Sequence, residues 1–438
     1  MKAAELFCAR YGRAPDGVWL APGRANLMGE HTDYNEGYVF PFALPQHIVA
    51  AAASRADGRL LLCSRQGGGE VAVTVADLEP GSVTGWAAYP AGMAWALREA
   101  GYPLAGASVA IDSDMPQGAG LSSSAALECA TALALTELAG LVIPGGELAA
   151  IARRAENEFV GVPSGIMDQS ASLLCRAGHA LLLDCRSMEF AQVPFDPAAT
   201  GAALLLVNTR TRHELTDGEF GRRRAECEQA ARQLGIGSLR DLTDLAQLAR
   251  LTDPVLRRRA SHVITDNRRV LDVVALLNSP SGSYREIGRL MTQAHLSLRD
   301  DFEISWPEAD TTVDAALEAG ALGARMMGGG FGGSVLALVP AAAVGVVREA
   351  VAAAFARHAW PEPEFLDAAP SASARRVSLR LFRTPRTPVA ATTPATRPKS
   401  VTMLPTPLGV LSAGLVRLRG ACLPGVVSAC RGCARLLP

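Results

Sequence analysis

Residues 115–126 read MPQGAGLSSSAA and lie between two segments with clear structural preferences. Residues 107–111 are small or β-branched, which predicts a strand, and residues 122–141 are rich in Ala and Leu, which predicts a helix. Glycines let a backbone approach an anion, and the free N–H groups and dipole of a helix N-terminus attract negative charge. The segment is therefore a candidate phosphate-binding loop. A serine-capped helix that follows a glycine turn is the alternative that these residues leave open.

The distribution of lysine limits the chemistry further. Lysine occurs only at Lys2 and Lys399, near the two ends of the sequence, and the other strongly basic side chains are all arginines. A Walker A phosphate loop, a protein-kinase strand lysine and a Schiff-base mechanism each need an ammonium group inside the protein. The sequence therefore excludes all three.

Composition sets the broad class of protein. The 438 residues are 49% hydrophobic and 19% charged, which predicts at least one large core and two domains with additional segments. The formal net charge of −1 gives no general attraction for nucleic acid or anionic lipid. The nine cysteines are scattered and odd in number, and no stretch offers the ~20 apolar residues of a membrane helix. We expect a cytoplasmic protein without a nucleic-acid or membrane partner.

A second segment, residues 23–37 with the sequence GRANLMGEHTDYNEG, crowds polar and charged groups between apolar strands. Sugar hydroxyls need donors and acceptors at fixed angles, which carboxylates, imidazole and amides supply together. A polyol-binding loop is one interpretation and a surface loop with unrelated charges is the other. His31 alone is typical of a structural histidine, because no metal-ligand spacing surrounds it.

A third segment, residues 163–169 with the sequence PSGIMDQ, places one acid in an apolar stretch after a helix expected over residues 146–158. Asp168 beside an arginine is a candidate base for an attacking hydroxyl group. The residues alone favour another interpretation, in which Asp168 caps the next helix.

A fourth segment, residues 325–338, reads RMMGGGFGGSVLAL and joins a glycine loop to an apolar strand. Glycines there permit positive φ and a close approach of phosphate or backbone, and a flexible surface loop is the alternative. Neither the glycine spacing nor a following helix supports a dinucleotide fold.

These four segments, in this order, resemble the galactokinase family of the GHMP superfamily of small-molecule kinases. The resemblance extends from about residue 5 to residue 380 and includes residues 184–187, 222–228 and 297–305. It implies an α+β fold of two domains with the active site in the cleft between them. A ribosomal S5-like domain is expected over residues 1–190 and a ferredoxin-like domain over 191–366, with a strand near 375–382 returning to the first. Residues 384–438, rich in Pro and Thr at the start, have no counterpart and are expected to be a linker and a disordered tail.

The resemblance also implies an activity, the transfer of phosphate from ATP to the anomeric C1 hydroxyl of galactose, with Mg²⁺ as cofactor in a monomeric protein. Arg24 is expected to keep Asp168 ionised, and Asp168 to act as base. The implied site residues are Gly118, Ala119, Gly120, Leu121, Ser122, Ser123 and Ser124 for the ATP phosphates, Glu30, His31, Asp33, Gly165 and Phe220 for the sugar, Asp168 and Arg24 for catalysis, and Ser124 and Glu156 for Mg²⁺.

One departure from the family pattern concerns the sugar. Phe220 stands where galactokinases usually carry a tyrosine whose hydroxyl reaches the sugar, so one hydrogen bond of about 0.5–1.5 kcal/mol is absent. Kinases of the same superfamily that act on N-acetylgalactosamine, arabinose or glucuronate therefore remain alternatives. A non-catalytic sensor of galactose and ATP is a further alternative, although such sensors have lost residues from the serine loop, which is uninterrupted here.

Overall fold

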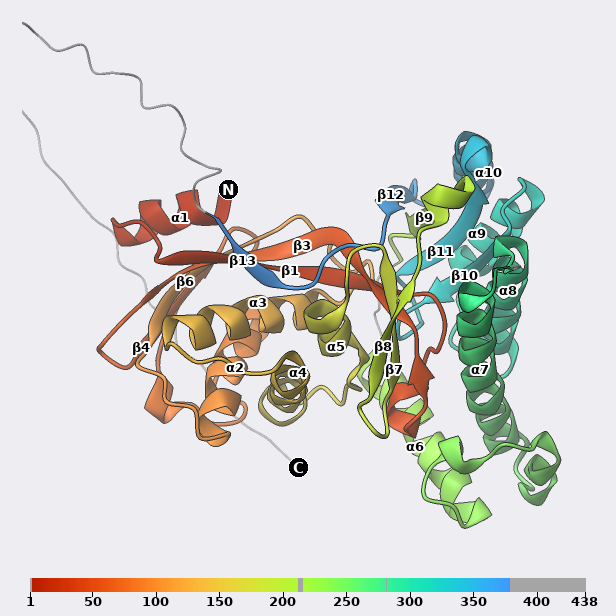
Figure 1. The fold of residues 1–438 in the computed structure, drawn as a ribbon, viewed down its shortest axis with the longest axis horizontal. Coiled ribbons are helices and arrows are strands. Elements are labelled where there is room, and N and C mark those ends of the chain that lie inside the picture. The colour runs from red at the N-terminus through yellow and green to blue at the C-terminus, as the bar shows by residue number, and fades with distance from the viewer. Residues whose placement is uncertain (1, 212–215, 281, 379–438) are drawn as a thin grey trace, which may run out of the picture. The chain divides into compact units, whose positions relative to one another are not determined.

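A computed structural model of the chain describes residues 2–211, 216–280 and 282–378. All of these belong to one compact unit, Met1–Thr384 (Figure 1). The expectations for residues 379–382 and for a linker and tail over 384–438 lie outside the described residues. None of the described helices is long and apolar enough to cross a membrane.

The described residues mix helices and strands along the chain, as expected for an α+β protein. The helices are α1 (Lys2–Tyr11), α2 (Ala88–Glu99), α3 (Ser123–Leu138), α4 (Gly145–Arg154), α5 (Met167–Leu174), α6 (Thr216–Leu234), α7 (Pro254–Asn278), α8 (Tyr284–Asp300), α9 (Pro307–Glu318) and α10 (Val344–Arg357). The strands are β1 (Gly17–Asn26), β2 (Tyr38–Val39), β3 (Pro41–Ser54), β4 (Arg59–Ser64), β5 (Glu70–Thr74), β6 (Ala107–Ser113), β7 (His179–Asp184), β8 (Phe190–Pro194), β9 (Ala202–Asn208), β10 (Gly323–Met327), β11 (Ser334–Pro340), β12 (Glu364–Ala368) and β13 (Arg375–Val377).

The first sheet carries the phosphate-loop segment. Within the described residues it has six strands in the order β13-β1-β3-β6-β4-β5, antiparallel except for the β4–β6 pair. Side chains alternate across it: Val18 and Val49 pack on α1, whereas Trp19 and Ala50 belong to the main core, which includes α2 and α3. Figure 1 accordingly shows α1 on one face of the sheet and α2, α3 and α5 on the other.

The second sheet lies in the later half of the described chain. Its strands follow the order β10-β11-β9-β12, and all neighbours are antiparallel. Both faces are covered: Leu204 and Leu206 join the main core, while the alternate residues Leu205 and Val207 pack in a second cluster with α6, α7, α9 and α10. The sheet is therefore a buried layer between helices, and the glycine segment emerges between its strands β10 and β11.

A short third sheet, in the order β2-β7-β8, follows the polar segment. The segment itself leaves β1 after Asn26 and reaches β2 at Tyr38, and Tyr38 pairs with Asp184 of β7. β1 and β3, the strands on either side, are antiparallel neighbours. The polar segment is therefore fixed at both ends by sheet.

The helices and strands expected from the sequence are present, with different bounds at some ends. The expected helix over 146–158 is α4 followed by a π-helical turn over Ala155–Val160. Helix α7 begins at Pro254, where the side chain of Asp253 caps it by accepting a hydrogen bond from the N–H of Val255.

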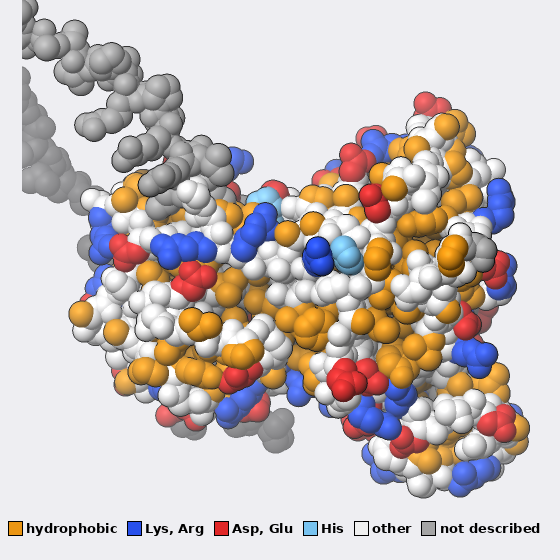
Figure 2. All heavy atoms as spheres, in the orientation of Figure 1, with side chains coloured by type: hydrophobic (Ala, Val, Ile, Leu, Met, Phe, Trp, Pro, Cys, Tyr) orange, Lys and Arg blue, Asp and Glu red, His pale blue; other side chains and the backbone are white. Residues whose placement is uncertain are grey.

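The strand β13 pairs antiparallel with β1 and lies within the expected range of the returning strand. The division of the chain near residue 190 into an S5-like and a ferredoxin-like domain stays a prediction. On the face drawn in Figure 2, acidic and basic side chains of the described residues are interspersed, in keeping with the formal net charge of −1.

Two glycines set how closely α8 packs on β10. A Cβ atom built at Gly288 overlaps the backbone at Leu322 and Gly323, and a Cβ at Gly323 overlaps the backbone of Gly288. We predict that Gly288→Ala destabilises the protein by about 1–3 kcal/mol, because the helix has to move off the strand. Thermal unfolding measures this as a lower melting temperature.

The matched control is Gly345→Ala in α10, where an added Cβ meets no atom within 4 Å. Because alanine favours a helix over glycine, this variant should be as stable as the wild type or more stable. Equal melting temperatures for Gly288→Ala and the wild type would contradict the packing account.

Candidate active site

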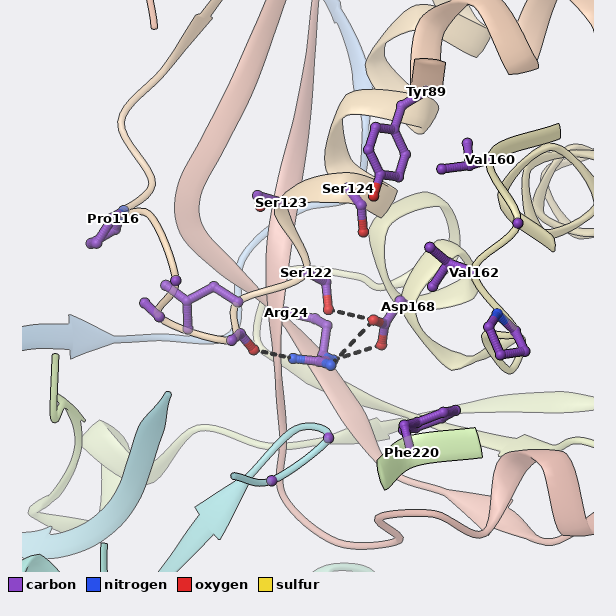
Figure 3. A pocket seen from close by; sticks show the side chains of 18 residues that line it. Arg24, Tyr89, Pro116, Ser122, Ser123, Ser124, Val160, Val162, Asp168 and Phe220 are labelled. Carbon is purple, nitrogen blue, oxygen red and sulfur yellow. Dashed lines mark hydrogen bonds and ion pairs between the residues drawn. The ribbon is translucent and has the colours of Figure 1, made fainter. Parts of the chain in front are cut away.

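The phosphate-loop segment precedes α3 as expected, and its backbone is left-handed at three positions. Gly118 and Gly120 have φ of 72° and 71°, and Ser122 has φ of 59°. The loop lines a cavity of about 640 Å³ together with the first residues of α3 (Figure 3). The N–H groups of a first helical turn have no partner within the helix, so this end of the cavity can bind an anion.

The centre of the site is an ion pair between β1 and α5. Arg24 Nε donates to Asp168 Oδ1 at 2.8 Å, and Arg24 Nη2 donates to Asp168 Oδ2 at 3.2 Å (Figure 3). Arg24 Nη1 donates to the carbonyl of Gly120 at 2.7 Å, and the Arg24 N–H donates to the carbonyl of Leu121 at 3.1 Å. Burial alone lowers the pKa of Arg24, but the charges of Asp168 and Glu30 outweigh it and raise that pKa. The guanidinium group therefore stays charged and ties the phosphate loop to Asp168.

The interpretation of Asp168 as a helix cap is wrong. Ile166 occupies the N-cap position of α5, and both carboxylate oxygens of Asp168 face Arg24 instead. The expected serine cap of α3 is wrong as well. Ser122 stands at the N-cap without a capping bond, since its Oγ donates to Asp168 Oδ2 at 2.6 Å.

A second, smaller cavity of about 200 Å³ adjoins the first. Arg24, Asp168, Phe220 and Gly329 line both cavities. The smaller one is otherwise lined by the polar segment, by the loop after the π-helical turn, by the start of α5 and by Gly328. The two cavities therefore meet at the Arg24–Asp168 pair.

Glu30 is the most deeply buried acid of the polar segment. Its Oε1 accepts the N–H of Gly328 at 2.8 Å, and the buried Arg325 lies 3.6 Å from the same oxygen. Burial raises the pKa of Glu30, although the charges of Arg325 and Arg24 act in the opposite direction. The glycine loop thus holds one carboxyl oxygen of Glu30 through its backbone.

His31 is held through both nitrogens of its ring. Its Nδ1 shares a hydrogen bond of 2.7 Å with the hydroxyl of Tyr34, and its Nε2 lies 3.2 Å from the carbonyl of Gly329. Burial, together with repulsion from His262, lowers the pKa of His31 to about 3. The residue is left-handed at φ 58°, which turns its ring towards Phe220 at a ring-centroid distance of 5.1 Å.

Asp33 and Gly165 are in direct contact. A Cβ atom at Gly165 would overlap the Asp33 carboxylate, so a glycine is required for the carboxylate to reach the cavity. Burial raises the pKa of Asp33, and the nearby negative charge of Asp168 raises it further. The site therefore gathers several acids around one arginine.

Glu156 lies beside the serine loop. Its Oε2 accepts hydrogen bonds from Ser164 Oγ at 2.6 Å and from Gln169 Nε2 at 2.8 Å. Burial raises its pKa, while hydrogen bonds from Ser164, Gln169 and Ser124 act to lower it. Two donors thus fix one oxygen of this carboxylate on the side of α5.

The described residues contain no group of three or more His, Cys, Asp and Glu side chains that could hold a metal ion. Ser124 and Glu156 supply only two oxygen ligands. Mg²⁺ commonly binds in this way, through one or two carboxylates with the remaining positions taken by water and substrate phosphates. The pair therefore fits a Mg²⁺ ion that arrives with a nucleotide.

Sequence analysis did not identify the support of the polar segment by α7. Asp266 Oδ2 accepts the N–H groups of Gly29 and Glu30, both at 3.1 Å. Asn267 Oδ1 accepts the N–H of Tyr38 at 2.8 Å, and His262 Nε2 lies 3.1 Å from the carbonyl of Glu30. These contacts span more than 200 residues of sequence, and no local pattern marks them.

Sequence analysis also missed a third cavity of about 290 Å³ beside the serine loop. Trp86, Tyr89 and Leu127 line it with Ser123 and Ser124. Tyr89 also lines the cavity of about 640 Å³ at the phosphate loop. Flat aromatic and aliphatic walls next to a phosphate-binding end suit a nucleobase.

The structure brings all the site residues expected from the sequence to the first two cavities. The larger is lined by Gly118, Ala119, Gly120, Leu121, Ser122, Ser123 and Ser124, the smaller by Glu30, His31, Asp33, Gly165 and Glu156, and both by Arg24, Asp168 and Phe220. Their roles in binding and catalysis stay predictions at this point.

Models of three families match the chain. They are described as the galactokinase galactose-binding signature, over residues 5–54, the GHMP kinases N terminal domain, over 88–176, and the GHMP kinases C terminal, over 273–357. Galactokinase of Streptomyces coelicolor is 54% identical over 378 residues, which are 85% of this chain and 97% of that protein. Galactokinase of Mycobacterium tuberculosis is 46% identical over 345 residues, 78% of this chain and 94% of that protein.

Solved structures of related kinases are also similar to this chain. Galactokinase of Lactococcus lactis, crystallised with galactose, is 31% identical, and the match covers 85% of this chain and 98% of that one with a TM-score of 0.81. Mevalonate kinase of Methanococcus jannaschii is 16% identical, with a TM-score of 0.58 over 81% of this chain and 98% of that one. The second likeness shows the fold alone.

Glu128 is a buried acid close to Glu156, and we expect it to make the stability of the protein depend on pH. Burial raises the pKa of Glu128 well above 4.5, and the charge of Glu156 adds to the rise. The folded state therefore holds this proton more tightly, so the stabilising contribution is complete below about pH 4.5 and is lost as the pH rises towards the folded pKa. We predict that the melting temperature of Glu128→Gln falls less than that of the wild type between about pH 6 and about pH 9.

The control is Glu137→Gln, an exposed position on the same helix, which should show the pH dependence of the wild type. The prediction fails if Glu128→Gln and the wild type lose the same number of degrees over this range.

Proposed function

Since the chain belongs to the galactokinase family of GHMP kinases, we propose that the two cavities that meet at Arg24 and Asp168 hold ATP and galactose and that the reaction occurs between them, at these two residues. The enzyme phosphorylates galactose at the anomeric C1 hydroxyl and releases galactose 1-phosphate and ADP. One observation carries the assignment of the site: the partly buried Arg24–Asp168 pair lines both cavities.

The larger cavity is proposed to bind the ATP phosphates. The N–H groups at the start of α3 and the hydroxyl of Ser123 face an anion, and the helix dipole adds to their attraction. Arg24 supplies positive charge at the other end of the loop, which takes the place of the lysine that this sequence lacks. The cavity beside Trp86 and Tyr89 is proposed to take the adenine base.

The smaller cavity is proposed to bind the sugar. Its volume of about 200 Å³ suits one hexose. Glu30 and Asp33 contribute carboxyl oxygens that accept hydrogen bonds, and the imidazole of His31 lies beside them. Such a set matches sugar hydroxyls, each of which is both donor and acceptor.

Asp168 is proposed to take the proton of the attacking hydroxyl. The C1 oxygen attacks the terminal phosphorus of ATP, the bond to the bridging oxygen breaks, and ADP leaves with the electron pair while the proton passes to Asp168. Arg24 holds the carboxylate with two hydrogen bonds and lies next to the phosphate loop, so it also offsets charge on the transferred group. Phosphoryl transfer depends mainly on such positioning and charge neutralisation.

Mg²⁺ is the proposed cofactor, held by Ser124 and Glu156 together with phosphate oxygens. When bound it neutralises phosphate charge. The chain itself contributes the orientation of Glu156, whose Oε2 is fixed by Ser164 and Gln169. Every contact proposed here comes from one copy of the chain, so a monomer suffices for the reaction.

Phe220 bears on the choice of sugar. It lines both cavities and packs against His31 and Tyr34 with ring-centroid distances of 5.1 and 5.5 Å. Its ring presents an apolar surface without a hydroxyl to the bound sugar. We therefore expect galactose to be the best substrate, with only modest discrimination against sugars that differ where they face Phe220.

We predict that the full-length chain forms ADP from ATP fastest with galactose when compared with N-acetylgalactosamine and arabinose at equal concentrations. A coupled assay for ADP measures this. Absence of turnover with galactose would contradict the function, and ADP formation with another sugar alone would reassign it.

We further predict that Asp168→Asn lowers kcat by about 100-fold or more, the usual contribution of a positioned base, and leaves ATP binding intact. Steady-state kinetics and titration with an ATP analogue measure the two effects. Asp272→Asn, an exposed position on α7, serves as the control and should keep the kcat of the wild type. An Asp168→Asn enzyme with near-normal turnover would refute the role of base.

A further inference from the structure

Ser122 has an unusual backbone conformation for a serine. Its φ and ψ are 59° and 49°, in the left-handed region, where its loop otherwise uses Gly118 and Gly120. A side chain with a Cβ atom is strained in this region, and a glycine would adopt it freely. A serine at such a position indicates that the hydroxyl has a purpose, because strain of this kind is typically retained at functional sites.

The hydroxyl group of Ser122 points to Asp168 and not to the helix that it precedes. It makes no capping bond to α3, and its Oγ lies 2.6 Å from Asp168 Oδ2. In Figure 3 the Ser122 side chain is directed at Asp168, whereas the side chains of Ser123 and Ser124 point elsewhere. The contact closes a ring, since Asp168 bonds Arg24 and Arg24 bonds the carbonyl of Gly120, two residues before Ser122.

We propose that Ser122 is a positioning residue for Asp168: its hydroxyl holds the carboxylate in the orientation in which Asp168 takes the proton from the sugar, and it is not a ligand of the ATP phosphates. This inference rests on the proposed function. A serine hydroxyl has one hydrogen to donate, so Ser122 cannot donate to a phosphate oxygen while it donates to Asp168. The phosphates are then bound by the loop N–H groups, Ser123 and Arg24.

The left-handed backbone of Ser122 is what directs its hydroxyl to α5. Oδ1 of Asp168 accepts from Arg24 Nε, and Oδ2 accepts from both Arg24 Nη2 and Ser122. Arg24 alone fixes the plane of the carboxylate, and the second donor on Oδ2 fixes how far the carboxylate turns towards the phosphate loop. Loss of that donor should therefore affect the step that uses Asp168 and leave nucleotide binding unchanged.

Two variants of the full-length chain separate the hydroxyl from the strain. Ser122→Gly removes both, whereas Ser122→Ala removes the hydroxyl and keeps the Cβ in the left-handed region. Hydrogen bonds to charged groups are strong enough that both variants should lose kcat by about tenfold or more. The KM for ATP should change by less than about threefold, because no phosphate contact is lost.

The melting temperatures of the two variants should differ, although both lose activity. Ser122→Gly should melt about 2 °C or more above Ser122→Ala, because only the glycine relieves the strain. The matched control is Ala359→Gly after α10, an exposed alanine with φ of 54°, which relieves the same strain away from the site and should keep the kcat of the wild type.

The kinetics with galactose decide between the possible outcomes. A tenfold loss of kcat with an unchanged KM for ATP supports the positioning role. A normal kcat in Ser122→Gly overturns it, and so does a rise in the KM for ATP of about tenfold, which would make Ser122 a phosphate ligand. If the wild type itself does not turn over galactose, the proposed function fails, whereas an active wild type with an equally active Ser122→Gly removes this inference alone.

Discussion

The site depends on one partly buried ion pair, which joins elements that are distant in sequence. Arg24 of β1 donates two hydrogen bonds to Asp168 at the start of α5, and the same guanidinium group donates a third to the carbonyl of Gly120 in the phosphate loop. Removing one partner would leave the other charge without its partner in a partly buried site, which is destabilising. The positions of the sheet, the serine loop and α5 relative to one another are therefore tied to the chemistry that the site performs.

The surroundings of this pair combine several acids with arginine as their basic residue, without lysine. The sequence has no lysine between Lys2 and Lys399, and the acids Glu30, Asp33 and Glu156 lie close to Asp168. Burial raises the pKa of each of these three acids. In the proposed site, N–H groups and a helix terminus bind the phosphates, and buried carboxyl groups accept hydrogen bonds from the sugar hydroxyls.

Local patterns in the sequence predicted most helices and strands, because hydrophobic runs, glycines and serines act within a few residues, whereas the set of candidate site residues came from the resemblance to a family. The same reasoning favoured Asp168 as a helix cap and offered a serine cap for α3. Asp168 instead bonds to Arg24, 144 residues away, and to Ser122, 46 residues away. The support that Asp266 gives to Gly29 was not predicted, because it joins residues 237 positions apart. Sequence patterns alone did not predict contacts between residues that are far apart in the chain. The expected roles of the site residues came from the resemblance to a family.

The most direct test of the central claim is a crystal structure of the full-length chain with galactose, Mg²⁺ and a non-hydrolysable ATP analogue. The account predicts the terminal phosphate at the N-terminus of α3, the C1 hydroxyl within about 3 Å of Asp168, and Arg24 between the two ligands. Galactose bound away from Asp168, or a phosphate chain that does not reach the serine loop, would contradict it.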